Sequence, residues 1–245
     1  MTASTSALTT RALGRRYGRT WALRDCTLTL PPGRVAALVG PNGAGKTTLM
    51  HLAVGLSRPT TGSVELFGRP VSVGGGTVLS DVGFVAQDHP LYPGFTVAEM
   101  LRLGRTLNRR WDETAARARL SELGIPLGSR VAKLSGGQRA QVSLTMALAK
   151  RPSLLILDEP LFSLDPLARQ GFVQGLMSMV RQDGLTVLFS SHVVSELGLV
   201  CDHLILLRDG RVRVEGLVDD LVAASGLTLE GMVLHHLRGS VEVAA

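Results

Sequence analysis

The sequence predicts an α/β fold with a parallel β-sheet at its centre, and three observations indicate this. An apolar run at 34–39 leads through a glycine-rich stretch into a helical pattern at 48–52, which is a strand–loop–helix unit. Further aliphatic runs typical of buried strands recur later in the chain, with helical segments between them. The segment 7–30 is rich in β-forming residues, whereas 96–150 has a helical pattern. A β-rich segment before the sheet and a helical insertion within it are therefore expected.

The first part of the chain is expected to form mainly strands. Two strands, 7–13 and 22–30, flank the segment 14–18, and Pro31-Pro32-Gly33 turns the chain into the strand at 34–39. Beyond the helix at 48–52, the expected elements are a strand at 63–67, a glycine loop at 74–76 and a strand at 82–86.

The second part of the chain begins with the helical segment. A single buried stripe is predicted for Val97, Met100, Leu101 and Leu103, and a second helix is expected at 115–123. The later strands are expected at 154–157, 185–189 and 204–207, with Asp209-Gly210 turning a hairpin into 212–214.

Composition narrows the functional classes. With 245 residues and 45% hydrophobic content, the chain can bury a sizeable core. It contains no apolar run of about 18 residues and no apolar core of a secretory signal, so a cytoplasmic location is expected. The net charge of +6 suits nucleotides, nucleic acid or an anionic membrane surface, but aromatic residues make up only 4%, which disfavours stacking on single-stranded nucleic acid. Cys26 and Cys201 lack metal-type spacing and are expected to be reduced and buried.

The segment 40–47, Gly-Pro-Asn-Gly-Ala-Gly-Lys-Thr, matches the phosphate-binding pattern G-x-x-x-x-G-K-[ST] at every fixed position. Its glycines let the backbone curl with N–H groups pointing inward around a polyphosphate, and the following helix N-terminus adds positive potential. Lys46 is placed to reach the β and γ phosphates, and the Thr47 hydroxyl is a suitable ligand for Mg²⁺. The candidate nucleotide-binding residues of this segment are Gly40, Asn42, Gly43, Gly45, Lys46, Thr47 and Thr48. A nucleoside triphosphate site is therefore predicted.

Further motifs follow in a specific order. They are Leu-Ser-Gly-Gly-Gln at 134–138, an apolar strand ending in Asp-Glu at 154–159, Ser-Leu-Asp at 163–165 and Ser-Ser-His at 190–192. Together with Tyr17 before the phosphate loop and Gln87 after its own strand, they make the chain from about residue 7 to 216 resemble the nucleotide-binding subunit of ATP-binding cassette (ABC) transporters.

This resemblance implies a P-loop NTPase (RecA-like) core with an antiparallel β subdomain and an inserted α-helical subdomain at about 88–150. It divides the chain into a disordered N-terminus at 1–6, a nucleotide-binding domain at 7–216 and a short helical tail at 217–245. The implied activity is ATP hydrolysis coupled to transmembrane transport, with ATP and Mg²⁺ as cofactors.

Two adjacent acidic residues are the candidates for catalysing ATP hydrolysis. Asp158 can hold Mg²⁺ through water, and Glu159 is placed to polarise the attacking water as a general base. A helix N-cap followed by an acid is the structural alternative for this pair.

Three other side chains are assigned roles with a structural alternative for each. His192 can hydrogen-bond the γ-phosphate, or it is an ordinary turn residue. Gln87 can contact the metal or the attacking water, or it is a polar residue that opens a loop. Tyr17 can stack on the adenine ring, or it belongs to the core.

A second anion-binding set is predicted at Ser135, Gly136, Gly137 and Gln138, where a serine hydroxyl and small residues begin a helix. In the family, such positions face the γ-phosphate held by a second copy, and Asp165 lies in a motif of the same interface. The resemblance therefore implies a head-to-tail homodimer or heterodimer in the active state. If the Ser-Gly-Gly segment were only a loop with an N-cap, ATP would bind without cooperativity.

Phe162 and Ser163 depart from the residues usual in the family.

The expected partner is an integral membrane permease subunit on a separate chain, which would hold the protein on the cytoplasmic face of the membrane. Leu91, Tyr92 and Phe95 are expected to form an exposed groove for this subunit, or to belong to the core. The ending of the chain resembles ATPases of small export systems for drugs, antibiotics or lipids, which favours export. The alternatives are a non-transport ATPase of the superfamily acting on nucleic acid or the ribosome, and a regulatory module without turnover; no nucleic acid is expected.

Overall fold

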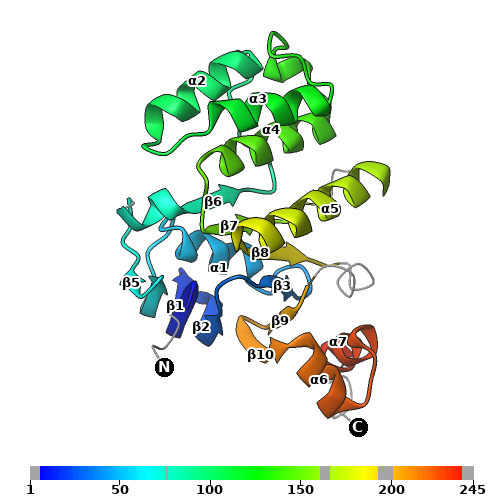
Figure 1. Ribbon diagram of the computed structural model, residues 1–245. Coiled ribbons are helices and arrows are strands. Elements are labelled where there is room, and N and C mark those ends of the chain that lie inside the picture. The colour runs from blue at the N-terminus through cyan, green and yellow to red at the C-terminus, as the bar shows by residue number, and fades with distance from the viewer. Residues whose placement is uncertain (1–5, 75–76, 161–165, 193–200, 239–245) are drawn as a thin grey trace.

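The computed structural model describes residues 6–74, 77–160, 166–192 and 201–238, and within these ranges the chain forms two β-sheets and several helices. Figure 1 shows the central sheet between a helical group formed by α2, α3 and α4 at the top and the C-terminal helices α6 and α7 at the bottom. The α/β fold is therefore confirmed.

The central sheet has the strand order β10-β9-β3-β8-β7-β6. Its strands are β3 (Val35–Val39), β6 (Val82–Val85), β7 (Leu154–Leu157), β8 (Thr186–Ser191), β9 (His203–Arg208) and β10 (Arg211–Leu217). Neighbouring strands from β9 to β6 pair in parallel, and β10 pairs with β9 antiparallel through the predicted hairpin. The carboxyl ends of the parallel strands therefore lie at one edge of the sheet.

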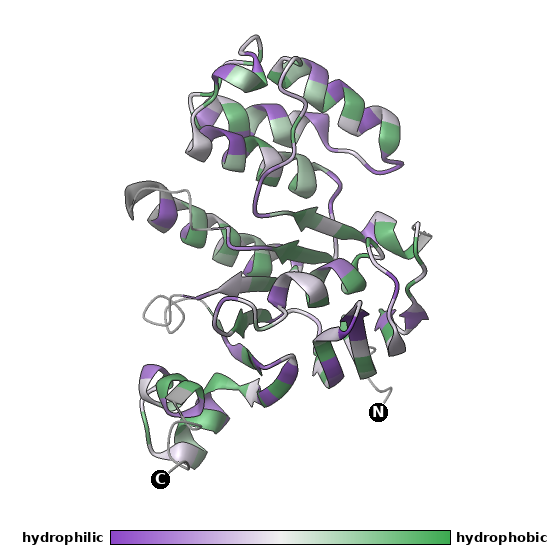
Figure 2. Cartoon of the chain, turned by 180° about the vertical axis from the view of Figure 1, so that it is seen from behind, coloured by the Kyte–Doolittle hydropathy of each residue, from purple (hydrophilic) through white to green (hydrophobic). Residues whose placement is uncertain are grey.

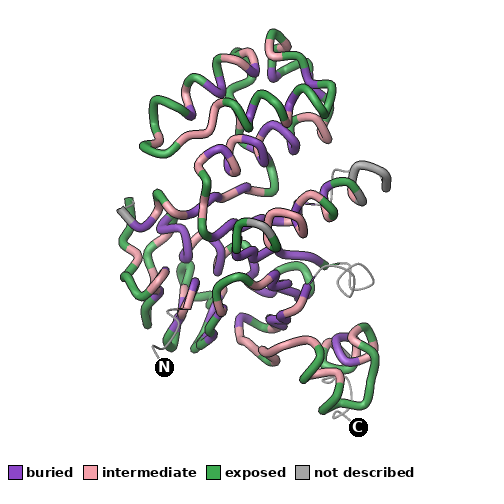
Figure 3. The backbone as a smooth tube through the Cα atoms, in the orientation of Figure 1, coloured by how far each residue is buried: buried purple, intermediate pink, exposed green. Residues whose placement is uncertain are grey.

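Both faces of this sheet are buried, as the aliphatic runs predict. Along β3, Ala36 and Leu38 pack with α1 (Lys46–Ala53) and the antiparallel sheet, whereas Val35, Ala37 and Val39 pack on the opposite face with α5 (Pro166–Asp183). Figure 3 shows the buried residues concentrated in these strands, and Figure 2 shows that the same strands are hydrophobic. A strand covered on both faces is apolar at every position, because its side chains alternate between the faces.

The antiparallel sheet has the order β2-β1-β4-β5. Its strands are β1 (Leu8–Tyr17), β2 (Thr20–Leu30), β4 (Thr61–Leu66) and β5 (Arg69–Pro70). The expected bounds of the first two strands, 7–13 and 22–30, were too short, because β1 continues to Tyr17 and β2 begins at Thr20. Pairing extends the strands: Arg16 lies opposite Trp21, with its guanidinium carbon 5.7 Å from the ring centroid. Position 14 of β1 requires glycine, because a Cβ there would overlap the Thr61 side chain.

The helical segment forms α2 (Val97–Leu107), α3 (Glu113–Glu122) and α4 (Gly136–Ala149), with the short 3-10 turn η2 (Val131–Lys133) before α4. These helices pack around their own core, which includes Val97, Leu101, Leu120 and Val142. A similar turn, η1 (Thr77–Asp81), precedes β6, and residues 75–76 of the predicted glycine loop lie outside the described residues.

The predicted buried stripe of α2 needs one correction. Val97, Met100 and Leu101 are buried, but Leu103 is half-buried and Gly104 takes the fourth buried position. The helical repeat of 3.6 residues places position 104, seven residues after Val97, on the buried face. Gly104 is required there because the Trp111 ring lies directly against its Cα.

The C-terminal helices are α6 (Val218–Ser225) and α7 (Leu229–Arg238). Met232 and Val233 of α7 are buried in the same cluster as Leu204 and Leu206 of β9, so this segment packs on the sheet. Cys26 and Cys201 are buried and reduced, as predicted. Among the described residues, no helix combines the length and apolar character needed to cross a bilayer.

The Gly104 contact gives a matched pair of stability predictions. We expect Gly104→Ala to lower the free energy of unfolding by about 1–3 kcal/mol, because the new Cβ overlaps Trp111. Gly171→Ala, in the exposed part of α5, meets nothing within 4 Å and should raise it by roughly 0.5–1 kcal/mol through helix propensity. Urea denaturation of both variants measures the difference, and equal effects would contradict the packing described here.

A second prediction concerns acid stability. His203 is 4% exposed and its Nε2 lies 3.9 Å from Glu215 Oε1, and neither ring nitrogen has a hydrogen-bond partner within the described ranges. Burial lowers the pKa of His203, with Arg34 acting in the same direction and Asp202 against it. Below a pH of about 6.5 the unfolded chain therefore binds a proton that the folded chain refuses, and stability falls as the pH falls.

We expect His203→Phe to lose less unfolding free energy than the wild type between pH 7 and pH 5, measured by urea denaturation at each pH. Burial raises the pKa of Glu215, which acts in the opposite direction, but this carboxyl is present in both proteins. An identical pH dependence in the two proteins would contradict the assignment.

Candidate nucleotide-binding site

The phosphate loop connects β3 to α1 at the carboxyl edge of the central sheet. Gly45 is the N-cap of α1 with a φ of 106°, in the left-handed region, and a Cβ there would lie 2.5 Å from the Ala22 carbonyl oxygen. No side chain caps this helix, so its first N–H groups point to the loop. Gly40 is equally confined, because a Cβ would overlap the carbonyl of Leu207. The loop is thus shaped to bind an anion.

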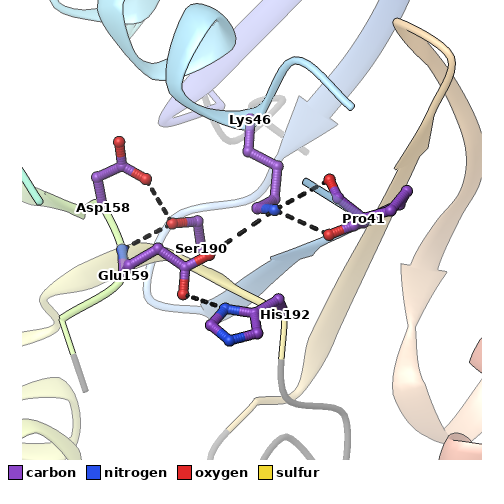
Figure 4. A network of polar contacts seen from close by, with 7 residues as sticks. Pro41, Lys46, Asp158, Glu159, Ser190 and His192 are labelled. Carbon is purple, nitrogen blue, oxygen red and sulfur yellow. Dashed lines mark hydrogen bonds and ion pairs between the residues drawn. The ribbon is translucent and has the colours of Figure 1, made fainter. Parts of the chain in front are cut away.

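Lys46 is folded back into this loop. Its side chain is 7% exposed, and its Nζ donates to the carbonyl oxygens of Gly40 at 2.8 Å and Pro41 at 3.3 Å. The same Nζ lies 3.7 Å from Glu159 Oε1. Figure 4 marks this contact with a dashed line. The ammonium group is therefore held between the loop and the acidic end of β7.

The two predicted acids follow β7 directly. Asp158 is 1% exposed; its N–H donates to the Val85 carbonyl at 2.9 Å, and its Oδ1 accepts a hydrogen bond of 2.7 Å from the Ser190 hydroxyl. Glu159 has a φ of 49°, and its N–H donates to the Ser190 Oγ at 2.8 Å. A non-glycine residue in the left-handed region is uncommon and is found disproportionately at functional sites.

His192 follows β8, the strand next to β7. Its Nδ1 lies 2.9 Å from Glu159 Oε2, and its side chain is 40% exposed. The Glu159 carboxylate, 11% exposed, is thus contacted by an ammonium on one oxygen and an imidazole on the other (Figure 4). Both carboxylate oxygens are therefore oriented by contacts with protein side chains.

A cavity of about 430 Å³ is bounded by these groups. Its lining residues are Ala22, Asn42, Gly43, Ala44, Gly45, Lys46, Thr47, Thr48, Gln87, Glu159 and His192. The volume is within the range of small-molecule sites. All three predicted catalytic residues and, of the seven candidates in the segment 40–48, all but Gly40 are therefore brought together in one cavity.

Tyr17 lies outside this lining, at the end of β1. Its ring is 49% exposed, and the Arg15 guanidinium carbon is 4.6 Å from the ring centroid. Partial burial raises the pKa of the Tyr17 hydroxyl, but hydrogen bonds with Arg15, Ser57 and Thr48 outweigh it, and the net shift is downward. The contact with Thr48 places the tyrosine beside the start of α1. Its ring is available at the surface and is not part of the core.

The second predicted anion-binding set is separate from the phosphate-loop cavity. Ser135 caps α4: its Oγ accepts from the Gln138 N–H at 3.2 Å, and Gln138 Oε1 accepts from the Ser135 N–H at 3.0 Å. With Gly136 and Gly137 in the first turn, this N-terminus belongs to the helical group. None of these side chains lines the cavity formed with Lys46. Asp165, Phe162 and Ser163 lie outside the described residues.

The residues proposed for Mg²⁺ supply hard oxygen donors: the Thr47 hydroxyl, the Gln87 amide and the Asp158 carboxylate. Asp158 is buried and accepts from a neutral hydroxyl, and no cationic side chain of the described residues pairs with it. A buried carboxylate without such a partner suits a cation. The described residues hold no group of three or more His, Cys, Asp or Glu side chains able to bind a metal.

Ser190 is a site residue that the sequence motifs did not assign. Its hydroxyl lies between the Asp158 carboxylate and the Glu159 backbone N–H, and so couples β8 to the acidic end of β7. A serine two residues before His192 was visible in the sequence. Its role could not be predicted because it depends on β7 and β8 being neighbours.

Comparisons with known proteins agree with this geometry. The family model described as "ABC transporter" matches residues 23–162. The chain is 36% identical over 213 residues to the sulfate/thiosulfate import ATP-binding protein CysA 2 of Chromobacterium violaceum, covering 85% of this chain but 58% of that relative's length. It is 35% identical over 251 residues to the Nod factor export ATP-binding protein I of Cupriavidus pinatubonensis, covering 98% of this chain and 76% of the relative.

A solved structure described as the ATP binding subunit of an ABC transporter superposes with a TM-score of 0.85 at 28% identity, covering 94% of this chain and 99% of that chain. The family match includes the phosphate loop, the α4 N-terminus and both acids after β7. From its sequence, its fold and the arrangement of this site, the chain belongs to the ABC transporter family, as an ATP-binding subunit.

Proposed function

We propose that the protein hydrolyses ATP in the phosphate-loop cavity and thereby powers transport through a separate membrane permease. The observation that carries this proposal is the Glu159 carboxylate. It faces the phosphate loop across the cavity and is oriented 2.9 Å from His192 Nδ1 and 3.7 Å from Lys46 Nζ. A carboxylate so oriented beside a polyphosphate site suits activation of a water molecule.

The phosphate loop would bind the polyphosphate through its backbone N–H groups, and Lys46 would neutralise the β and γ phosphates. Tyr17 would stack on the adenine ring, since its ring is exposed beside the start of α1. Gln87 and His192, which line the same cavity, would contact the γ-phosphate end of the nucleotide.

Mg²⁺ would be held by Thr47, Gln87 and Asp158, and when bound it supplies positive charge that neutralises the phosphate oxygens. Ser190 keeps the Asp158 carboxylate in place through its 2.7 Å hydrogen bond. Glu159 would accept the proton of the attacking water, and His192 holds the orientation of that carboxylate.

The active form is proposed to be a head-to-tail dimer, homomeric or heteromeric. Ser135, Gly136, Gly137 and Gln138 begin α4 away from the cavity of their own chain, so they would act on ATP held by a second copy. In this arrangement two nucleotides are enclosed at one interface, with Asp165 as a further interface residue. ATP binding would close the dimer, and hydrolysis would release it.

The proposed permease site is a groove of about 710 Å³ between α1, β6, α2 and α4, which includes Leu91, Met100, Leu107 and Met146. Tyr92 and Phe95 do not line this groove; they are 58% and 38% exposed, with ring centroids 5.1 Å apart. These aromatic residues are therefore surface residues and not core. An exposed apolar groove of this kind suits an amphipathic helix of a partner. Bound there, the protein would be peripheral on the cytoplasmic face of the membrane.

Export is the direction we propose. The relative named for Nod factor export aligns over 98% of this chain, which includes α6 and α7, whereas the sulfate/thiosulfate import relative aligns over 85%. An assay of substrate movement in vesicles that contain the permease would test the direction.

Turnover should depend on Glu159. We expect Glu159→Gln to reduce ATP hydrolysis at least about a hundredfold while ATP binding is retained, because the water-activating carboxylate is lost. In ATP and Mg²⁺ the variant should elute as a dimer in size-exclusion chromatography, and wild-type activity should rise faster than linearly with protein concentration. Glu122→Gln, which removes an exposed carboxylate of α3, is the control and should hydrolyse ATP normally. A Glu159→Gln protein with near wild-type turnover would refute the assignment of the base.

A complementation experiment tests the shared site. Lys46→Ala and Ser135→Arg should each be inactive as a homodimer, since each damages both sites. Mixed together, they form heterodimers in which one site retains Lys46 from one chain and Ser135 from the other. About half of the dimers in an equal mixture are heterodimers, and each heterodimer has one intact site out of two. Activity on the order of a quarter of wild type should therefore return. No recovery on mixing, with both variants folded by circular dichroism, would mean that Ser135 acts within its own chain.

A further inference from the structure

A second cavity, of about 590 Å³, lies between the helical group and α5. Ala116 of α3, Thr145 and Leu148 of α4, Met179 of α5 and Leu185 before β8 contribute to its lining. It shares no lining residue with the phosphate-loop cavity or with the proposed permease groove. Its volume would accommodate a small organic molecule.

Arg119 of α3 lines this cavity together with three other charged residues, Asp112, Arg151 and Asp183. Its Nη2 donates to the Gln141 Oε1 at 3.1 Å, and its Nη1 lies on the side of Gly175 in α5. The Nε is buried and has no hydrogen-bond partner in the described part of the chain. Burial lowers the pKa of the Arg119 guanidinium, and Glu122 opposes this shift.

The charge of Arg119 is not neutralised by the other groups that line the cavity. Arg151 is paired with Asp112, whose Oδ2 lies 2.9 Å from the Arg151 Nε. Asp183 is exposed at the surface, and no carboxylate of the described residues comes within ion-pair distance of Arg119. A partly desolvated guanidinium that has only a neutral amide as partner is unusual, because buried cations are normally paired with an anion.

We propose that this cavity is a binding site for a small organic anion, a carboxylate or a phosphate monoester, with Arg119 as its anchor. A planar guanidinium can bind an oxyanion through two hydrogen bonds, and Nη1 and Nη2 are the donors proposed for this contact because the Nε is buried. Leu148, Met179 and Leu185 provide apolar walls for the carbon skeleton of the ligand. The bound anion would supply the negatively charged partner that Arg119 lacks among the described residues.

The position of the cavity gives the ligand a means to affect turnover. It touches α4, whose N-terminus carries Ser135, and it touches α5 on the other side. A bound anion that joins the two helices favours one orientation of α4 relative to the sheet. This consequence rests on the proposed function, whereas the binding site itself does not.

Binding is tested by isothermal titration calorimetry on the full chain, with succinate and glycerol 3-phosphate as separate probes. Saturating ADP keeps the phosphate loop filled, and sodium chloride holds the ionic strength constant. We expect heat of binding with at least one probe, and affinity at least tenfold weaker in Arg119→Gln. The identity of the responding probe distinguishes a carboxylate ligand from a phosphate ester.

Two further variants make the result specific. Arg102→Gln removes one exposed positive charge from α2 and should bind as the wild type does. Ala115→Phe adds bulk to the cavity lining and leaves Arg119 in place, so it should also weaken binding, and it decides the question if Arg119→Gln does not fold. The proposal is overturned if neither probe binds the wild type at millimolar concentration, or if Arg119→Gln and Ala115→Phe bind as tightly as the wild type. The calorimetric result is independent of ATP hydrolysis, so loss of the proposed function would be seen separately.

Discussion

Burial of the central sheet on both faces is the constraint on which the remaining structure depends. The strands β3 and β7 are buried at every position, because α1 and the antiparallel sheet cover one face and α5 covers the other. The parallel arrangement then brings the carboxyl ends of the strands to one edge. Gly40 after β3, Asp158 after β7 and His192 after β8 therefore meet, although they are far apart in the sequence. The nucleotide site is a consequence of this packing.

Polar contacts between neighbouring elements orient the side chains of the site. The Ser190 hydroxyl joins the Asp158 carboxylate and the Glu159 backbone, and Lys46 and His192 contact the Glu159 side chain. The left-handed backbone of Glu159 costs on the order of 1 kcal/mol, which these contacts offset. Orientation of a carboxylate before the substrate binds lowers the reorganisation that catalysis requires.

The elements of the fold could be predicted where their pattern is local. Apolar runs revealed β3, β7 and β9, and the spacing of apolar residues revealed α2 and α3. The ends of β1 and β2 could not be predicted, because the residues between Gly14 and Tyr17 form a strand only when paired with β2. The buried position of Gly104 was missed because a glycine has no apolar side chain to mark it, although it falls on the helical repeat; its contact with Trp111 depends on the tertiary structure.

The sequence by itself determined the chemistry of this protein: a phosphate loop with Lys46, two acids after an apolar strand, and a histidine after the next one. These assignments are readable because each motif consists of residues adjacent along the chain. The tertiary structure alone decided that Ser190 supports both acids, that the α4 N-terminus lies apart from the cavity of its own chain, and that Arg119 pairs with no carboxylate of the described residues. Such relations depend on which strands and helices become neighbours, and that outcome is set by burial over the whole chain rather than by any local pattern.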